Sequence, residues 1–351
     1  MPLPENAVTP DSTPPSAPHA SGDSRVARWL PRYAWGVLAY NVAVILWGAV
    51  VRASGSGNGC GDHWPLCEGQ VIPHAAQIAT VIEFAHRLTS GVAVVLVVGL
   101  LAFSLRCVAA GHPGRRYAAA ALGFTLVEGL IGAALVLLGD TGTNASMGRV
   151  AILSVHLVNT FLLLAALALA ARAFGAAGRA PGEEPRPGGG LSALYGAGLL
   201  GTLAVAVTGT IAALSDTLFH VTSLATGLQL DFAATSSPML RLRIVHPVLA
   251  VTVAGLLLAL AGRTRASAAA PPRARRLAAR LAALVVLQLG IGASDVALLA
   301  PLWIQVLHLL TADLIWIVLV LLSAEMWPVP ATGRAPRSRP AAATGAGVTA
   351  G

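Results

Sequence analysis

Residues 302–323 read L-W-I-Q-V-L-H-L-L-T-A-D-L-I-W-I-V-L-V-L-L-S, an apolar run that carries one histidine and one aspartate. A helix needs about 20 apolar residues to cross the hydrocarbon core of a membrane. Seven similar runs precede it, so we expect eight spans, at 33–51, 77–105, 117–138, 150–171, 191–214, 244–262, 278–300 and 302–323. The predicted fold class is therefore an all-α integral membrane protein with eight transmembrane helices.

The composition agrees with this class. Of the 351 residues, 56% are hydrophobic and only 11% are charged, and 37 are glycines, which allow membrane helices to pack closely. A soluble chain of this length would need a larger share of polar residues. The net charge of +8 would also suit a nucleic-acid partner. However, the arginines cluster at the ends of the spans, so we expect no nucleic acid.

The distribution of arginine predicts the orientation in the membrane. With the N-terminus inside, 18 of the 23 basic residues fall on inside segments and 4 on outside segments, while Arg87 lies within the second span. Positive residues favour the cytoplasmic side. We therefore expect a multi-pass protein of a bacterial plasma membrane, in contact with lipid, with both termini in the cytoplasm. Segments 1–27 and 327–351 are expected to be disordered tails.

The chain contains an internal repeat with an offset of about 160 residues. E-G-L-I-G-A at 128–133 matches Q-L-G-I-G-A at 288–293, and G-A-V-V-R-A-S from Gly48 matches G-T-I-A-A-L-S from Gly209. We expect two four-helix bundles, 28–175 and 191–326, joined by a cytoplasmic linker at 176–190. Four spans return a chain to the same side, so the two halves have parallel topology about a pseudo-twofold axis along the membrane normal.

Four histidines lie one each in the even-numbered spans, namely His86, His156, His246 and His308. Those spans all run from outside to inside, so we expect the four imidazoles at one depth in the outer half of the bilayer. Ionisable residues there are functional candidates, and one histidine from each of two facing helices is how a helix bundle holds haem iron. The alternative is that backbone carbonyls and helix contacts satisfy the four rings.

Of the four spans that carry these histidines, one has an acidic residue one helical turn before its histidine. Glu83 lies three residues before His86. The matching positions before the other three histidines hold Leu153, Arg243 and Gln305. Glu83 is therefore a candidate base, and an ion pair with Arg87 is the structural alternative. Three further acids lie within spans and either form hydrogen bonds in the bundle or serve a proton path: Glu128, Asp295 and Asp313.

The first outer loop, 52–76, contains Cys60 and Cys67. The outer compartment is oxidising, so we expect a disulfide or a redox-active pair. The alternative is a zinc site that also uses His63, although a fourth ligand is not evident. Cys107 lies at the cytoplasmic end of the second span and is expected to be an ordinary free thiol.

At these residues the sequence resembles the haem A synthase family. The resemblance spans residues 28–326 and is carried by G-N-G-C-G-D-H-W-P-L-C at 57–67, E-F-A-H-R at 83–87, S-V-H-L-V-N-T at 154–160, R-I-V-H-P at 243–247 and V-L-H-L at 306–309. It implies an oxidoreductase that converts haem O to haem A. The reaction oxidises the methyl group at porphyrin position 8 to a formyl group by successive hydroxylations, with electrons passed through a bound b-type haem.

The resemblance also implies roles for individual residues. His246 and His308 would ligate the iron of the cofactor, haem b, in the C-terminal half. His86 and His156 would be the axial ligands of the substrate haem in the N-terminal half, with Glu83 as the catalytic acid beside it. The outer-loop pair of the family matches Cys60 and Cys67, while the second cysteine pair of some members is absent from 215–243.

The implied partners are haem O as substrate and the haem O synthase that produces it, and homo-oligomerisation is left open. The alternative from another class is a non-enzymatic dihaem membrane electron carrier. The two differ in haem content, because a carrier would hold two identical haems in stoichiometric amounts. A synthase would hold one stable b haem together with variable haem O or haem A.

Overall fold

The computed structural model describes residues 23–74, 77–175 and 189–326. Eight helical spans within these residues are long and apolar enough to cross a membrane, which confirms the expected fold class. The helices are α1 (Asp23–Ala53), η1 (Ser56–Asn58), α2 (Ile78–Cys107), α3 (Pro113–Leu137), α4 (Met147–Gly175), α5 (Gly189–Leu218), α6 (Leu224–Phe232), α7 (Pro238–Arg243), α8 (Val245–Ala266), α9 (Pro272–Ala297) and α10 (Leu302–Met326). Helices α7 and α8 together form the sixth span.

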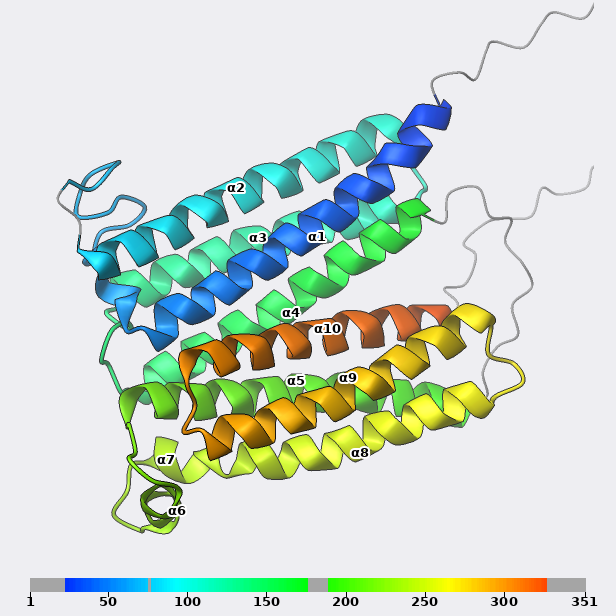
Figure 1. The fold of residues 1–351 in the computed structure, drawn as a ribbon. Coiled ribbons are helices and arrows are strands. Elements are labelled where there is room, and N and C mark those ends of the chain that lie inside the picture. The colour runs from blue at the N-terminus through cyan, green and yellow to red at the C-terminus, as the bar shows by residue number, and fades with distance from the viewer. Residues whose placement is uncertain (1–22, 75–76, 176–188, 327–351) are drawn as a thin grey trace, which may run out of the picture.

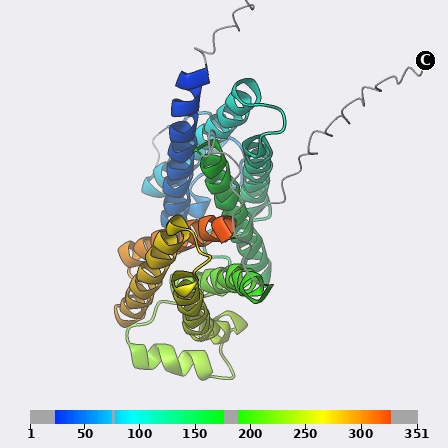
Figure 2. The ribbon, with the colours of Figure 1, turned by 90° about the vertical axis from the view of Figure 1, so that its right-hand side faces the viewer.

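The spans form two groups that follow the order of the chain. Figure 1 shows α1 to α4 lying together in one group, and α5, α8, α9 and α10 in the other. The view along the helices in Figure 2 shows the same two groups. This arrangement is compatible with the predicted pair of four-helix bundles, whereas the pseudo-twofold relation between them stays a prediction.

The interface between the two groups is formed largely by α4 and α10. The indole Nε1 of Trp316 on α10 donates to the carbonyl oxygen of Phe161 on α4 at 2.6 Å, and their rings pack 5.2 Å apart. Leu164 and Leu319 are fully buried in the same core cluster. Because this cluster includes buried residues of both groups, the two halves share one continuous apolar core.

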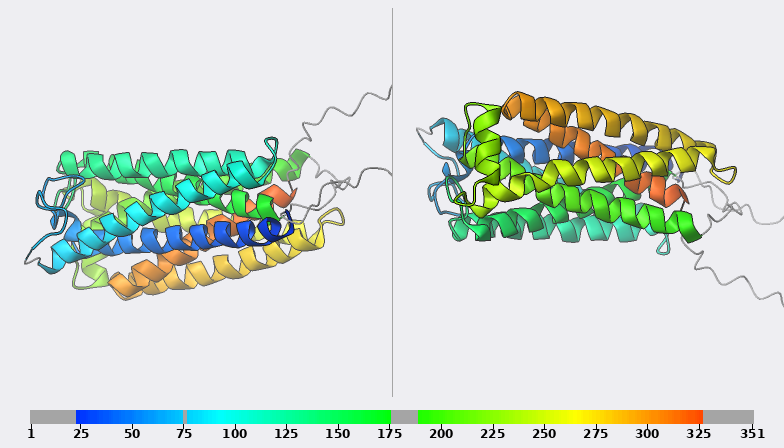
Figure 3. Two further views of the ribbon diagram at one scale, coloured as in Figure 1. Left: turned by 90° about the horizontal axis from the view of Figure 1, so that it is seen from above. Right: turned by 90° about the horizontal axis from the view of Figure 1, so that it is seen from below.

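The two ends of the bundle differ in the structures they carry. Figure 3 shows α6, α7 and the loop between α1 and α2 at one end, which we call the loop end. The start of α1 and the end of α10 lie at the opposite end, as an even number of spans requires. At that opposite end Glu325 of α10 pairs with Arg172 of α4 at 3.0 Å and with Arg273 of α9 at 3.1 Å.

Some boundaries differ from those expected. The seventh span ends at Ala297 rather than at residue 300, because Leu299 and Ala300 adopt left-handed backbone angles, with φ of 59° and 55°, in the turn before Pro301. The first helix begins at Asp23, inside the segment 1–27 that we expected to be disordered, and aspartate and serine at residues 23 and 24 are residue types that favour the start of a helix. Segments 1–22, 176–188 and 327–351, which hold the rest of the expected tails and linker, lie outside the described residues.

The segment between the fifth and sixth spans contains two short helices that we did not predict. Helix α6 is capped by Ser223, whose hydroxyl accepts from the N–H of Thr226, and α7 is capped by Ser237, whose hydroxyl accepts from the N–H of Leu240. Proline at position 238 suits the first turn of α7. These helices cover the loop end of the C-terminal half.

Candidate functional site

The four span histidines lie on alternating spans near the loop end. His86 is on α2, His156 on α4, His246 on α8 and His308 on α10. His246 is the second residue of α8, but α7 extends the same apolar span towards the loop end, from Pro238. Each group of four spans therefore carries two histidines, and all four histidines lie in the part of the bundle near the loop end.

The two histidines of the C-terminal half lie next to each other. The ring centroids of His246 and His308 are 6.3 Å apart, and the ring planes are inclined at 79°. Two metal–imidazole bonds of about 2 Å each, together with about 1 Å from each bound nitrogen to the centre of its ring, account for a spacing of this size. This pair therefore fits one metal ion held between two imidazoles.

The contacts of these two rings leave atoms free for a metal. Nδ1 of His246 lies 3.2 Å from the carbonyl oxygen of Val205 and 3.3 Å from the hydroxyl of Thr208. A histidine that donates from Nδ1 presents Nε2 to a metal. Nε2 of His308 lies 3.2 Å from the amide nitrogen of Gln288, so a metal at His308 would displace this contact. Nδ1 of His308 is buried and has no hydrogen-bond partner among the described residues.

Glycines form a cradle for three of the four imidazoles. A methyl group placed on Gly48 of α1 would lie 3.1 Å from Cε1 of His86. A methyl group on Gly209 of α5 would lie 3.0 Å from Cε1 of His246. A methyl group on Gly292 of α9 would lie 3.0 Å from Cε1 of His308. Each imidazole therefore occupies the space that a side chain at the facing position would fill, because glycine lets the neighbouring helix approach closely.

In the N-terminal half, His86 and His156 lie on α2 and α4. Nδ1 of His86 is buried and has no partner in the described part of the chain. Nδ1 of His156 lies 2.6 Å from Oε2 of Glu128, although this oxygen stands off the direction of the ring N–H. Glu128, rather than Glu83, is therefore the acid in contact with a span histidine.

Glu83 is 4% exposed and both of its oxygens are in use. Oε1 accepts from Nε of Arg87 at 3.1 Å and from Nη2 at 2.5 Å, while Oε2 accepts from the backbone N–H of Cys60 at 2.8 Å. The ion pair that formed the structural alternative for Glu83 is thus present. In this arrangement Glu83 fastens the outer loop to α2.

The outer loop is closed by a disulfide between Cys60 and Cys67, both of which are buried. The paired sulfurs are not available to zinc, which removes the alternative zinc site. Arg87 secures the loop further, because its Nη1 donates to the carbonyl oxygens of His63 at 2.6 Å and Leu66 at 2.8 Å. Cys107 is a free thiol, as expected.

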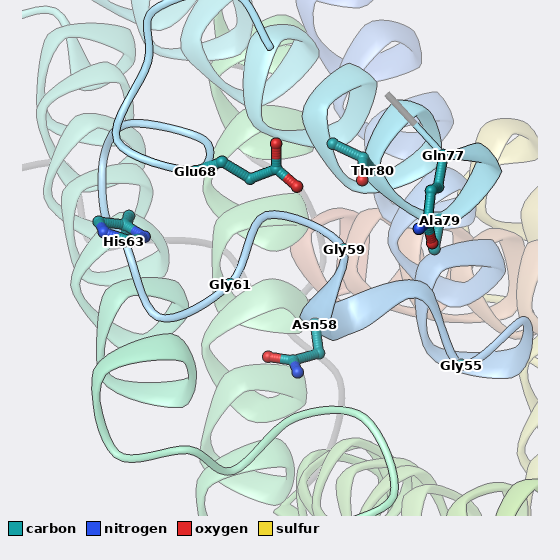
Figure 4. A pocket seen from close by; sticks show the side chains of 9 residues that line it. All are labelled: Gly55, Asn58, Gly59, Gly61, His63, Glu68, Gln77, Ala79 and Thr80. Atoms are coloured by element: carbon teal, nitrogen blue, oxygen red, sulfur yellow. The ribbon is translucent and has the colours of Figure 1, made fainter. Parts of the chain in front are cut away.

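A hollow of about 470 Å³ lies between this loop and the start of α2. Figure 4 shows His63 and Glu68 on the loop side, and Gln77 and Thr80 on the side of α2. Gly59 lies against the backbone of Ala79, so only a residue without a side chain fits there. None of the four span histidines lines this hollow. It is therefore separate from both histidine pairs.

Arg52, at the loop end of α1, connects the two halves. Its Nη1 donates to the carbonyl oxygen of Ala213 at 2.7 Å and to the hydroxyl of Thr217 at 2.8 Å, both on α5. Its Nη2 donates to Oε1 of Gln305 on α10 at 3.0 Å. Gln305 occupies the position three residues before His308 that Glu83 holds before His86. This side chain therefore serves the interface between the halves.

The remaining acids of the spans have different surroundings. Both carboxylate oxygens of Asp313 are buried without a hydrogen-bond partner in the described residues, and the side chain is 0% exposed. Oδ1 of Asp295 is likewise without a partner there. Glu128 is hydrogen-bonded by Asn159 and Thr160, which agrees with the structural alternative for this residue.

The sequence did not predict the contact between Glu128 and His156 or the bridge made by Arg52. A signal for the first was present, because Glu128 and Gln288 begin the two matching stretches of the repeat. The glycines facing His86 and His246 were also visible in the repeat, at Gly48 and Gly209. Their contact with the histidines depends on how each helix is rotated, which a single sequence does not specify.

The fold and the four histidines define a polytopic helical membrane protein that has a histidine on every second span, with His246 and His308 side by side on facing helices. Residues 31–320 match the COX15-CtaA family model, which is described as cytochrome oxidase assembly protein. Because this match covers most of the chain, the protein belongs to that family, which includes the haem A synthases.

Individual relatives support the same family. A protein of Thermus thermophilus named Protoheme IX farnesyltransferase is 47% identical over 296 residues, which cover 84% of this chain and 48% of that protein. The chain therefore spans about half the length of this relative. A protein named Heme A synthase from Alkalihalophilus pseudofirmus is 35% identical over 126 residues, or 36% of this chain and 40% of that protein. Another from Shouchella clausii is 41% identical over 98 residues, or 28% of this chain and 33% of that protein.

Proposed function

We propose that the protein is a haem A synthase, which oxidises the position-8 methyl group of haem O to a formyl group by successive hydroxylations. The observation that carries the proposal is the close pair of His246 and His308, with His86 and His156 on the matching spans of the other half, in a chain of this family. A haem supplies redox chemistry at its iron and takes its axial ligands from the protein. The chain's own side chains would hold and orient the two porphyrins and handle protons beside them.

The donor set fits haem better than it fits a bare metal ion. Within the described residues, no group of three or more His, Cys, Asp or Glu side chains is placed to hold a metal ion. A porphyrin brings its own nitrogen ligands, so a haem iron needs only one or two side chains. The 6.3 Å spacing of the His246 and His308 rings and the glycines that face them are consistent with such a site.

In this proposal the two halves have different tasks. His246 and His308 hold a resident b-type haem that passes on electrons. His86 and His156 hold the substrate haem. The two halves share one core through α4 and α10, which supports the proposal that the two sites work together in one protein. Oxidation of a methyl group releases protons as well as electrons, so a base near the N-terminal site is required.

Glu83 is the proposed acid–base residue of the N-terminal site. Its position one helical turn before His86 supports this role. Its contacts with Arg87 and with the N–H of Cys60 support a second role, as the anchor of the disulfide loop. The two roles predict different effects of replacing Arg87. Only the role as anchor of the disulfide loop depends on the ion pair between Glu83 and Arg87.

The partners and location follow from the same proposal. The matched part is 48% of the Thermus relative, so more than half of that protein lies outside the match and has room for the farnesyl transfer in its name. Farnesyl transfer to protohaem produces the substrate of the proposed reaction, so we expect contact with haem O synthase. The arginine distribution supports cytoplasmic termini and insertion in the plasma membrane.

The proposal is tested by the haem content of cells. Haem extracted from a strain that lacks its own haem A synthase should contain haem A only when this chain is expressed. A variant with His86 and His156 both replaced by Ala is the matched control, because it retains the C-terminal pair. Haem A in the strain that expresses the double variant would overturn the proposal. So would the absence of haem A from the strain that expresses the intact chain. Two identical stoichiometric haems without haem A would favour the dihaem electron carrier.

A further inference from the structure

Glu128 and Gln288 occupy equivalent places in the two halves, and each contacts the last histidine of its own half. They begin the matching stretches at 128–133 on α3 and 288–293 on α9. Oε2 of Glu128 lies 2.6 Å from Nδ1 of His156, and Nε2 of Gln288 lies 3.2 Å from Nε2 of His308. The two histidines thus have chemically different neighbours, a carboxylate in one half and a neutral amide in the other.

The carboxylate of Glu128 is held in place by donors on α4. Its Oε1 accepts from Nδ2 of Asn159 at 2.8 Å and from the hydroxyl of Thr160 at 2.9 Å, which leaves Oε2 directed towards His156. Asn159 is itself fixed by a second bond, from Nδ2 to the carbonyl oxygen of Phe124 at 2.9 Å. A carboxylate with several donors in a membrane span is held in a single orientation.

The C-terminal half lacks this arrangement. Aligning His156 with His308 places Thr311 and Ala312 at the positions of Asn159 and Thr160. The hydroxyl of Thr311 donates to the backbone of its own helix, to the carbonyl oxygen of Leu307, and Ala312 has no donor side chain. Oε1 of Gln288 has no partner among the described residues. The donors that hold the carboxylate are therefore present in the N-terminal half and missing from the C-terminal half.

We propose that Glu128 is a positioning residue that accepts Nδ1–H of His156, leaves Nε2 for the iron, and makes the N-terminal haem site the one of lower reduction potential. A carboxylate behind a metal-ligating histidine fixes the tautomer and raises the basicity of the ligand. A negative charge near the iron also favours its oxidised form. Gln288 exerts neither effect on His308, so the C-terminal site has the higher potential.

This difference gives a direction to electron flow. It rests on the proposed function in one respect, namely that both histidine pairs bind haem. Conversion of a methyl group and one water molecule to a formyl group releases four electrons and four protons. The half with the lower potential would suit the substrate, and an acceptor of the quinone class outside the chain would have to take up the electrons. The repeat-related exchange of Glu for Gln thereby separates the half that oxidises substrate from the half that carries electrons away.

The test is a redox titration of the purified full-length protein loaded with added iron–protoporphyrin IX. The variants are Glu128→Gln, Glu128→Asp and, as the matched exchange in the other half, Gln288→Glu. We expect Glu128→Gln to shift the N-terminal reduction equilibrium at least tenfold towards the reduced form, about 59 mV for one electron. The C-terminal haem should be unchanged. Gln288→Glu should lower the potential of the C-terminal haem. Glu128→Asp retains the carboxylate, so its N-terminal potential should lie between those of the unmodified protein and Glu128→Gln.

The results separate this inference from the proposed function. An unchanged N-terminal potential and ferric electron paramagnetic resonance spectrum in Glu128→Gln would overturn the inference, even if the cells make haem A. The expected shifts in a chain that yields no haem A would support the inference and overturn the function. If Glu128→Gln fails to bind the N-terminal haem, binding by both Glu128→Asp and Thr160→Val supports positioning by the carboxylate. Loss of binding in all three variants counts against it.

Discussion

Glu83 and Arg243 lie 160 residues apart at equivalent positions of the two halves, and each fastens a loop-end segment to the span that carries a histidine. Glu83 binds the backbone of Cys60, whereas Arg243 pairs with Asp216 at 2.8 Å and with Asp231 of α6 at 2.7 Å. The two halves thus use opposite charges for the same structural task. Any catalytic role of Glu83 has to be separated experimentally from this shared anchoring role.

The first prediction concerns Glu83 and its partner Arg87. Glu83→Gln retains shape and hydrogen bonding but removes the base, so we expect a folded protein that keeps its b haem. We expect this variant to accumulate haem O or a partly oxidised alcohol form. Arg87→Lys is the matched control, because it keeps the positive charge but cannot hold Glu83 and both loop carbonyls at once. Haem extraction followed by chromatography measures both variants.

The outcome depends on which role dominates. A catalytic Glu83 requires that Arg87→Lys still make haem A while Glu83→Gln does not. Equal loss in both variants, with increased proteolysis of the 54–77 loop, would assign Glu83 to the anchor. Normal haem A production by Glu83→Gln would refute the catalytic role. Absence of either protein from the membrane would favour the structural ion pair, since breaking a buried pair costs about 3–5 kcal/mol.

The second prediction is that His246 and His308 bind the resident haem. Replacing either one with Ala should abolish the low-spin b-type spectrum of the purified protein, because neither helix offers a second imidazole beside the first. His156→Ala is the matched control and should keep that spectrum. A normal, stoichiometric b haem in both single variants of the C-terminal pair would contradict the assignment.

Much of the fold could be predicted from the sequence because its signals are local. Long apolar runs define the eight spans, and the structure contains all eight. The predicted location of Cys60 and Cys67 in the oxidising outer compartment similarly indicated a disulfide, which is present. The end of the seventh span was wrong by a few residues, because apolar Leu299 and Ala300 continue the hydrophobic pattern while their backbone turns.

The arrangement of the candidate site was less predictable because it depends on contacts between helices. The pattern identified four histidines on alternate spans, but it did not show that His156 meets Glu128. It also gave no indication that Arg52 crosses to α5 and α10. Both contacts depend on helix rotation and on how the two halves pack. The short helices α6 and α7 were missed because, at 9 and 6 residues, they are too short to give a span signal, although Ser237 before Pro238 is a recognisable start.

The third prediction is a disulfide between Cys60 and Cys67 in the isolated protein. A membrane-permeable thiol reagent should label only Cys107 under oxidising conditions, and all three cysteines after reduction and unfolding. Cys60→Ser should lower stability by no more than about 2–3 kcal/mol, because the closed loop is short. Full labelling of Cys60 and Cys67 without reductant would contradict the disulfide.

The last prediction concerns the glycines that face the imidazoles. A methyl group on Gly292 would lie 3.0 Å from Cε1 of His308, which is tighter than an ordinary contact. Gly290, two residues earlier on α9, has nothing within 4 Å of the same addition and provides the matched control. Alanine is favoured over glycine inside a helix by about 1 kcal/mol. Neither Gly292→Ala nor Gly290→Ala should therefore weaken the helix itself.

Only Gly292→Ala is expected to displace the imidazole of His308. We expect its affinity for added iron–protoporphyrin IX to fall about tenfold, which corresponds to about 1.4 kcal/mol. Gly290→Ala should bind as the unmodified chain does. Spectroscopic titration of the haem-depleted protein measures both. Equal binding by the two variants would show that the imidazole moves aside, and that the glycine at 292 serves helix packing rather than the position of the ligand.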